Sequence, residues 1–485
     1  MSPDLLAIGL WLVFLTGGAL WLSGRGRSGQ DLLSAHHDLP AWAICLSVVA
    51  TETSTLTVIS VPGIAWQKGM VFVGLGGGYL LGRIAVARWL LPLYMRGSLT
   101  SAYEYLALRF GRHMQRTASC TFLITRLLAE GVRLFASTLP VCALLAAHDL
   151  ILSPLAVLIG LTALTALYTA LGGLRAVIWS DAAQFILYFS GAAVCAVWLF
   201  HGLPPSGRSL AAEPGQFFPF SLHGSVLTDA FAPLTALVGG AIMAMASHGT
   251  DQLMVQRVLA ARSLKDARKA MVFSAVVVTA LFALLSLCGI FLRAGAGGVS
   301  LSAAGYHSPD DVFAHFMVTG LPQGLSGLMV AGVISATMGS LSSALNAMTS
   351  STFADLLPAR PSGPGRFSTA FVTGCWAVAL IAAACGFSAS GQSVLIFGMQ
   401  IAGYSYGALL GAFLLGMMVR SVDQRTALSA FLVTLPVMAL IIGFCRPGGQ
   451  SIAFPWLVPL GVIITFGSTA VLMTFRALKK GNIGQ

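Results

Sequence analysis

Long apolar runs separated by short polar segments follow one another along almost the whole chain. About thirteen of these runs are roughly 18 to 25 residues long, enough for a helix to cross a hydrocarbon core of about 30 Å. The pattern therefore predicts an all-α polytopic membrane protein. The runs lie near residues 4–22, 41–65, 70–93, 118–147, 151–171, 180–201, 229–249, 270–292, 321–350, 367–388, 393–418, 427–445 and 453–475. The first run lacks a small-residue cleavage site, so it is predicted to be a retained helix.

Composition excludes the main soluble alternatives. The 485 residues are 56% hydrophobic and only 9% charged, with a mean hydropathy of +0.85. A soluble chain carries about 25% charged residues, so a soluble enzyme and a disordered chain are both excluded. The eight cysteines are scattered singly through apolar stretches, which indicates small core residues and neither a disulfide scaffold nor a metal site.

The net charge of +11 reports orientation in the membrane. When the loops are assigned alternately to the two sides, nineteen Lys and Arg residues fall on one side and four on the other. The basic side is predicted to be cytoplasmic, which places the N-terminus outside and the C-terminus inside a plasma membrane, the inner membrane if the source is bacterial. The basic excess is thereby explained, so no nucleic acid partner is expected.

The second run carries a cluster of polar groups that a lipid-facing helix would not carry. Residues 50–57 read A-T-E-T-S-T-L-T and are followed by Pro62 and Gly63. Five hydroxyls and one carboxylate in eight residues favour a discontinuous helix that lines a cavity. The alternative is that the hydroxyls bond back to their own helix, which accounts for one or two of them but poorly for five.

Three charged residues share one face of the fourth run. Arg126, Glu130 and Arg133 are spaced i, i+4 and i+7, so Glu130 can pair with either arginine. A cation inside a membrane needs a partner or a cavity, and the same holds for Arg83. Either one arginine on this face binds an anionic solute, or both are neutralised internally by Glu130 together with Glu52 or Asp251.

Two further features bear on ion binding and energy source. Asp181 opens the sixth run, either as a helix cap or as a cation ligand. The ninth run is rich in hydroxyls, at residues 340, 342, 343 and 349–351, which serve either close helix packing or a dehydrated monovalent cation.

The glycines at 74 and 76–78 are followed by no G-K-[ST], so they predict close helix packing. No nucleotide motif is present in the chain, which excludes an ATP-driven pump unless another subunit drives it.

Three stretches resemble the sodium:solute symporter family. They are Y-T-A-L-G-G-L-R-A-V-I-W-S-D-A-A-Q (168–184), T-D-Q-L-M-V-Q-R-V-L-A-A (250–261) and L-P-Q-G-L-S-G-L-M-V-A-G-V-I-S-A-T-M-G-S-L-S-S-A-L-N (321–346). The resemblance implies a single transmembrane domain over residues 1–485 with a leucine-transporter-like fold. Two inverted five-helix repeats are expected at 41–201 and 229–418, with one extra helix before them at 4–22 and two after them within 427–475.

The resemblance also implies a main sodium site and makes a second one possible. The main site takes its ligands from the first and eighth core helices, at the positions that correspond here to Ala50, Thr53, Ala336, Gly339 and Ser340. Gly339 replaces the usual Ser or Thr, so sodium is expected to bind more weakly or to recruit water or the Thr53 side chain. A second sodium, bound by some members, would use Asp181, Ser340, Ser342 and Ser343. Two sodium ions would roughly square the attainable accumulation ratio.

For the solute, the resemblance implies contacts beside the breaks of the first and sixth core helices. The corresponding residues are Glu52, Ser54 and Thr57, with Gln400 and Tyr404 as gates. Together with Arg133, Glu52 favours a carboxylate or a zwitterion over a neutral sugar. The expected function is sodium-coupled import of a small organic solute across the lipid bilayer, with Na⁺ as the coupling ion and no obligate protein partner.

Three other functions stay open at this point. One is a solute sensor on the same scaffold, although sensors append a cytoplasmic region and this chain ends about ten residues after its last predicted helix. A symporter for a neutral solute and a passive channel are the others. An enzyme is not expected, because no cluster of His, Cys and carboxylates offers a metal or a nucleophile.

Overall fold

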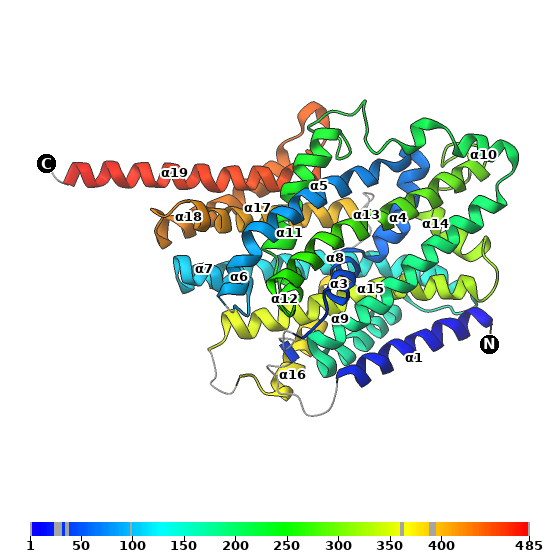
Figure 1. Cartoon of the computed structure of the whole chain (residues 1–485), viewed down its shortest axis with the longest axis horizontal. Helices are drawn as coiled ribbons and strands as arrows, with labels where there is room; N and C mark the ends of the chain where they lie inside the picture. The colour runs from blue at the N-terminus through cyan, green and yellow to red at the C-terminus, as the bar shows by residue number, and fades with distance from the viewer. Residues whose placement is uncertain are drawn as a thin grey trace.

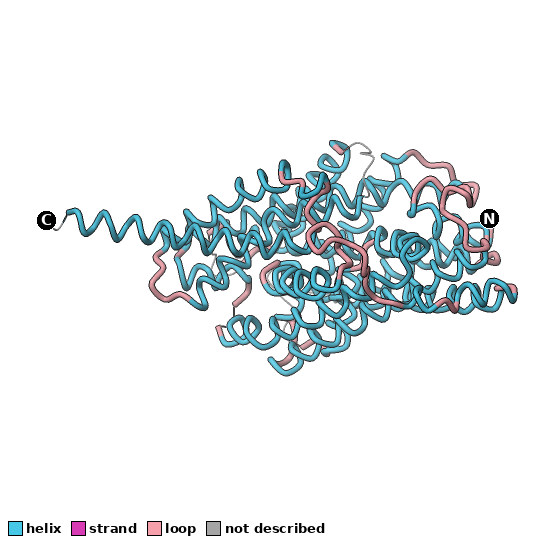
Figure 2. Tube along the Cα trace, turned by 90° about the horizontal axis from the view of Figure 1, so that it is seen from above, coloured by secondary structure: helices cyan, strands magenta, loops and turns pink. Residues whose placement is uncertain are grey.

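The computed structural model describes residues 2–23, 32–33, 38–97, 99–358, 363–387 and 394–483. Helices make up almost all of this part of the chain (Figures 1 and 2), and its only β-type pairing is one isolated bridge between Leu39 and Ala261. The N-terminal end of α1 and the C-terminal end of α19 lie at opposite ends of the long axis (Figure 1). The prediction of an all-α protein is confirmed.

The α-helices carry the following bounds. They are α1 (Pro3–Ser23), α3 (Ala41–Glu52), α4 (Thr55–Lys68), α5 (Phe72–Ala85), α6 (Leu91–Arg96), α7 (Ala102–Phe110), α8 (Arg112–Ala146), α9 (Pro154–Gly202), α10 (Pro205–Ala211), α11 (Gly240–Gly249), α12 (Gln252–Leu259), α13 (Leu264–Gly295), α14 (Pro309–Thr319), α15 (Leu325–Ser351), α16 (Arg366–Gly386), α17 (Val394–Met418), α18 (Gln424–Phe444) and α19 (Leu457–Ile483). Three π-helical turns, η2 (Val86–Leu90), η4 (Thr235–Gly239) and η5 (Thr352–Leu356), interrupt or extend them.

Ten helices of the described chain are long and apolar enough to cross a membrane. Each of the thirteen predicted runs nevertheless overlaps one of the helices or part of one. The two numbers differ for two reasons. Some runs are joined into one continuous helical stretch, such as residues 55–95, while the run at 229–249 is divided into η4 and the short helix α11.

The helix α9 joins two predicted runs, 151–171 and 180–201, across a sharp bend at Gly173. The backbone of Gly173 has φ +62° and ψ −164°, a conformation that L side chains rarely adopt. A Cβ at this position would also collide with the backbone of Leu32. Glycine is therefore required where the two halves of α9 change direction.

The second predicted run is a broken helix, as its polar cluster indicated. α3 ends at Glu52, the backbones of Thr53 and Ser54 are extended, and α4 begins at Thr55. A second interruption separates α11 from α12 at Thr250 and Asp251. The chain thus contains two bipartite helices, α3/α4 and α11/α12.

The glycine-rich stretch of α5 packs against another helix, as predicted. A Cβ added at Gly78 would collide with the carbonyl of Ala236 in η4, and one added at Gly82 would collide with the carbonyl of Ala241 in α11. Small residues let two helix backbones approach this closely. α5 therefore lies directly against the segment that leads to the second break.

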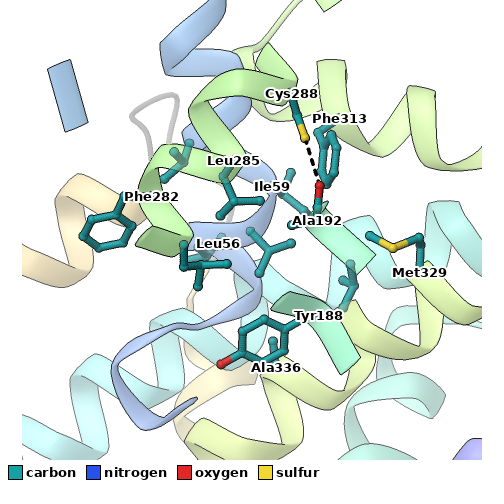
Figure 3. Close-up of a cluster of buried hydrophobic side chains, with 14 of the residues drawn as sticks. Leu56, Ile59, Tyr188, Ala192, Phe282, Leu285, Cys288, Phe313, Met329 and Ala336 are labelled. Atoms are coloured by element: carbon teal, nitrogen blue, oxygen red, sulfur yellow. Dashed lines mark hydrogen bonds between the residues drawn. The ribbon is translucent and has the colours of Figure 1, made fainter. Parts of the chain in front are cut away.

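A large apolar core holds α4 against α9, α13, α14 and α15 (Figure 3). Its labelled members are Leu56, Ile59, Tyr188, Ala192, Phe282, Leu285, Cys288, Phe313, Met329 and Ala336. The thiol of Cys288 donates to the carbonyl oxygen of Ala192 at 3.6 Å, so this cysteine is a core residue. Ala336 of α15 belongs to the same cluster, which brings the apolar core up to the polar segment of α15.

Candidate functional site

The break in α3/α4 leaves backbone carbonyls without helical partners. The amide of Thr53 donates to Val49 at 2.9 Å, and the next helical bond runs from Val58 to Ser54 at 3.2 Å. In this fully described stretch, the carbonyls of residues 50–53 accept no backbone amide. Such carbonyls are suited to ligating a cation.

Hydrogen bonds on both sides of the break fix its position against α15. Thr51 Oγ1 lies 3.1 Å from Ser343 Oγ, and Thr55 Oγ1 lies 2.5 Å from Thr337 Oγ1. The segment of α15 between residues 337 and 343 therefore faces Thr53. The Thr53 hydroxyl is fully buried and has no hydrogen-bond partner.

The expected main-site residues come together at this interface. Ser340 Oγ donates to the carbonyls of Ala336 at 3.3 Å and Thr337 at 3.0 Å, so its lone pairs stay free. Ala50 is buried in the last turn of α3. Ala50 and Thr53 thus lie at the break, Ala336 and Ser340 lie on the helix that packs against it, and Gly339 has no side chain to contribute.

The space beside Gly339 is occupied by a residue that sequence reasoning did not single out. A Cβ on Gly339 would stand 2.6 Å from Gln184 Oε1 and 3.6 Å from Asp181 Oδ1. Both of these oxygens are buried and have no hydrogen-bond partner. A buried polar atom without a partner is costly, so these two oxygens are candidates to ligate an ion or an ordered water.

The residues expected for a second sodium are only partly assembled. Ser343 Oγ lies 3.4 Å from Asp181 Oδ2, whereas Ser342 donates to the carbonyl of Gly339 at 3.0 Å. A fully buried arginine, Arg257 of α12, also contacts Asp181 and Ser343. The sequence pattern contained no signal for this pairing, because α9, α12 and α15 are far apart along the chain.

A cavity of about 90 Å³ lies between the two broken helices. Of the expected solute contacts, Glu52 and Arg133 line it, whereas Ser54 and Thr57 are buried and outside its lining. The full lining is Thr51, Glu52, Tyr79, Arg126, Arg133, Met243, Ser247, His248, Asp251, Leu253, Met254, Ala402, Gly403, Tyr406, Phe454 and Val458. Tyr406 takes part, while Tyr404 does not, and the side chain of Gln400 lies outside the described residues.

Three arginines and three carboxylates in and around the cavity balance one another. Arg83 of α5 donates to Glu52. Arg126 of α8 donates to Glu130 at 2.9 Å and also to Asp251. Arg133 lies 3.3 Å from Glu130. The expected surplus positive charge on α8 is therefore compensated by Asp251 from another helix.

The arginines differ in their access to the cavity. The Arg133 side chain is 22% exposed, whereas that of Arg126 is 6% exposed and that of Arg83 is fully buried. Arg133 thus keeps donors available for a solute, while Arg126 and Arg83 are enclosed by their partners. Arg126 is therefore paired internally, whereas Arg133 is exposed to the cavity.

Asp251 fixes the second break through three contacts. Its Oδ1 accepts from the amide of Leu253 at 2.9 Å, and its Oδ2 accepts from Arg126 and from the Tyr406 hydroxyl. The sequence carried one usable signal for this role. Residues T-E-T-S at 51–54 and G-T-D-Q at 249–252 each place a carboxylate beside a threonine where a helix stops.

Two bipartite helices with a partly open cavity between them, beside a hydroxyl-lined helix, are typical of the leucine-transporter-like fold. The fold is shared with a solved structure described as a substrate-bound outward-open state of a Na⁺-coupled sialic acid symporter. The two superpose with a TM-score of 0.84 over 97% of each chain at 22% identity.

The chain belongs to the sodium:solute symporter family, whose model matches residues 33–434. It is 30% identical to the sodium-dependent multivitamin transporter of Oryctolagus cuniculus over 95% of this chain and 75% of the relative. It is 28% identical to the sodium/iodide cotransporter of Homo sapiens over 84% of this chain, and it spans 64% of that relative. Identity to the sodium/sialic acid symporter of Proteus mirabilis is 25%, over 86% of this chain and 84% of the relative.

Proposed function

We propose that this chain is a sodium-coupled symporter that imports a small organic carboxylate or zwitterion by alternating access. The observation that carries the proposal is the position of the first break against the hydroxyl-rich α15. Hydrogen bonds from Thr51 to Ser343 and from Thr55 to Thr337 fix the two sides of the break there. Carbonyls without helical partners opposite the hydroxyl-rich α15, beside an Asp181 carboxylate that already pairs with Arg257, support binding of a monovalent cation. Relatives named for sodium-coupled transport support it.

Sodium is proposed to bind the carbonyls of Ala50, Thr53 and Ala336 together with the hydroxyl of Ser340. Gln184 Oε1, beside Gly339, and the unpaired hydroxyl of Thr53 replace the hydroxyl that glycine lacks. A sodium ion moving inward releases about 2.3 kcal/mol per 100 mV of membrane potential, which drives the solute against its gradient.

The solute is proposed to bind in the cavity between the two breaks, with its carboxylate on Arg133. A planar guanidinium offers two parallel donors to a carboxylate, and Arg133 uses only one contact on Glu130. Glu52 borders the same cavity, where it can bind the ammonium group of a zwitterion. Met243, Met254 and Phe454 provide apolar walls for the rest of the molecule.

The proposed setting is the plasma membrane, the inner membrane if the source is bacterial, with the N-terminus outside and the C-terminus in the cytoplasm. The excess of Lys and Arg in the loops on one side supports this orientation. The proposed inverted repeats are residues 41–201 and 229–418. Each of them contains one of the two bipartite helices near its beginning.

Uptake by proteoliposomes tests the function. An inward sodium gradient should drive accumulation of a carboxylate or amino acid from a panel that also contains sugars, and a choline gradient should not. Arg133→Ala should weaken binding about ten- to hundredfold, as expected for a lost charge-assisted hydrogen bond. Arg133→Lys should restore binding only in part, because lysine lacks the planar fork.

Arg446→Ala is the matched control, since this arginine is exposed and bonds only the carbonyl of Ile442. Uptake of a sugar in place of carboxylates would contradict the proposed solute class. Solute binding without sodium-driven accumulation would contradict transport and favour a sensor.

A further inference from the structure

A fully buried ion pair stands where the oxygens expected for a second sodium meet. Asp181 of α9 and Arg257 of α12 both have fully buried side chains, and Arg257 Nη2 lies 3.3 Å from Asp181 Oδ2. Ser47 donates to the same carboxylate oxygen at 2.7 Å, and Ser343 lies 3.4 Å from it. The carboxylate, two hydroxyls and a guanidinium form one cluster.

The guanidinium of Arg257 is held on several sides. Its Nε donates to Ser47 Oγ at 3.0 Å, its Nη1 donates to the carbonyl of Leu253, and its Nη2 donates to Ser343 Oγ. Each of the three nitrogens therefore has a protein acceptor. A group anchored in this way is a fixed part of the cluster and not a passing surface contact.

Arg257 already occupies contacts that a second sodium would need at these oxygens. A second sodium would have to touch Asp181 and Ser343, and Arg257 Nη2 already contacts both of them. In the described part of the chain, no hydrogen bond links the other two expected ligands to Asp181, because their hydroxyls donate within α15. Ser342 donates to the carbonyl of Gly339, and Ser340 donates to Ala336 and Thr337.

Charge leads to the same conclusion. One buried carboxylate needs one cation, and Arg257 supplies it. Adding sodium would place two cations against one carboxylate at a position without solvent exposure, where charges repel strongly. The second carboxylate oxygen, Oδ1, faces Gly339 on the main-site side of the cluster.

We propose that Arg257 is a tethered cation that takes the place of the second sodium, so that this carrier couples one sodium ion to each solute molecule. The inference rests on the proposed function of sodium-coupled transport. Its consequence is that accumulation follows the first power of the sodium gradient and not its square.

The test measures sodium stoichiometry in the full-length protein. Purified wild-type chain should bind one ²²Na⁺ per molecule, and proteoliposome uptake should depend on sodium with a Hill coefficient near 1. Arg257→Gln keeps polar contacts to Ser47 and Ser343 but leaves Asp181 uncompensated. It should therefore bind a second ²²Na⁺, and its Hill coefficient should rise toward 2 if the variant transports.

The double variant Arg257→Gln/Asp181→Asn removes both charges and should return to one bound sodium. Arg268→Gln is the matched control, because Arg268 donates to the carbonyl of Ala87 away from the cluster. It should bind one sodium like the wild type. Equilibrium binding in detergent also gives an answer for a variant that has lost transport.

Two results would overturn the inference: two sodium ions bound to the wild type, or a single sodium bound to folded Arg257→Gln. Failure of the proposed function looks different, because the wild type would then bind no sodium and show uptake indifferent to it. A second cation gained by Arg257→Gln and lost again in the double variant has no explanation other than the tethered charge.

Discussion

The two broken helices differ in how their polar groups are used. At the break of α3/α4, the Thr53 hydroxyl has no partner, and the Glu52 side chain is 17% exposed beside the cavity. At the break of α11/α12, Asp251 is buried and engaged by Leu253, Arg126 and Tyr406, while Thr250 bonds Ala246 at 2.9 Å. The Thr53 hydroxyl at the first break thus has no partner, whereas Thr250 and Asp251 at the second break are both hydrogen-bonded.

This difference separates two roles that the same interruption can serve. Oxygens without hydrogen-bond partners at the first break are suited to an ion that binds and dissociates during transport. Satisfied groups at the second break fix α12 relative to α8, and so they set the shape of the cavity wall. Both carboxylates are paired to an arginine on another helix, because neither can remain buried and uncompensated.

The largest expected effect comes from disrupting the ion pair at the second break. Asp251→Ala should lower the free energy of unfolding by about 3–5 kcal/mol, because removing one partner of a buried ion pair leaves Arg126 uncompensated. Thermal unfolding in detergent measures the loss.

Asp423→Ala is the control for this substitution. Asp423 pairs with Arg476 at 2.6 Å, and the two side chains are 55% and 45% exposed. The pair is therefore expected to contribute less than about 1 kcal/mol. Asp423 also caps α18 by accepting from the Thr426 amide, which adds about 1 kcal/mol, so Asp423→Ala should still cost clearly less than Asp251→Ala. Equal destabilisation by the two substitutions would contradict a structural role for Asp251.

An intermediate effect is expected where α15 faces the first break. Ser340→Ala should raise the sodium concentration for half-maximal uptake about tenfold, because one ligand interaction of about 1.4 kcal/mol is lost. Asn346→Ala is the comparison on the same helix, since Asn346 lies 3.4 Å from Gln256 of α12. Its sodium dependence should match that of the wild type, and an unchanged value for Ser340→Ala would remove Ser340 from the ion site.

The smallest effect distinguishes the two threonines at the breaks. Thr53→Val removes a buried hydroxyl without a partner, so stability in sodium-free buffer should be unchanged or slightly increased. Sodium should then stabilise the variant less than the wild type, as measured by the sodium-dependent shift of Tm. Thr250→Val should instead leave that shift unchanged while costing about 1 kcal/mol of stability through its lost hydrogen bond. The opposite pattern would assign ion binding to the second break.

Several parts of the site were within reach of the sequence. Local composition indicates the broken second run, the hydroxyl-rich α15 and the close packing of α5. Exposed polar groups are costly in lipid, and small residues let membrane helices approach closely. The shared helical face of Arg126, Glu130 and Arg133 follows from spacing.

The pairing of charges was not within reach. Arg83 was predicted to need a partner, and Arg126 had Glu130, Glu52 and Asp251 as candidates. Only the packing of α5, α8 and α12 decides that Glu52 binds Arg83 and Asp251 binds Arg126. Gln184 and Arg257 lie in stretches that carry the family resemblance, but nothing in the sequence indicated their partners, which come from distant helices.

The amino-acid sequence by itself determined a lipid-embedded helical bundle, the interruption of its second helix and the hydroxyl-lined surface facing that interruption. These follow from periodicity and from the cost of polar groups in hydrocarbon. The tertiary structure alone decided which arginine neutralises which carboxylate, which oxygens remain unfilled and that a guanidinium stands beside Asp181. Helical periodicity specifies the face on which a side chain lies, but the partner of a buried charge depends on which other helix packs against that face.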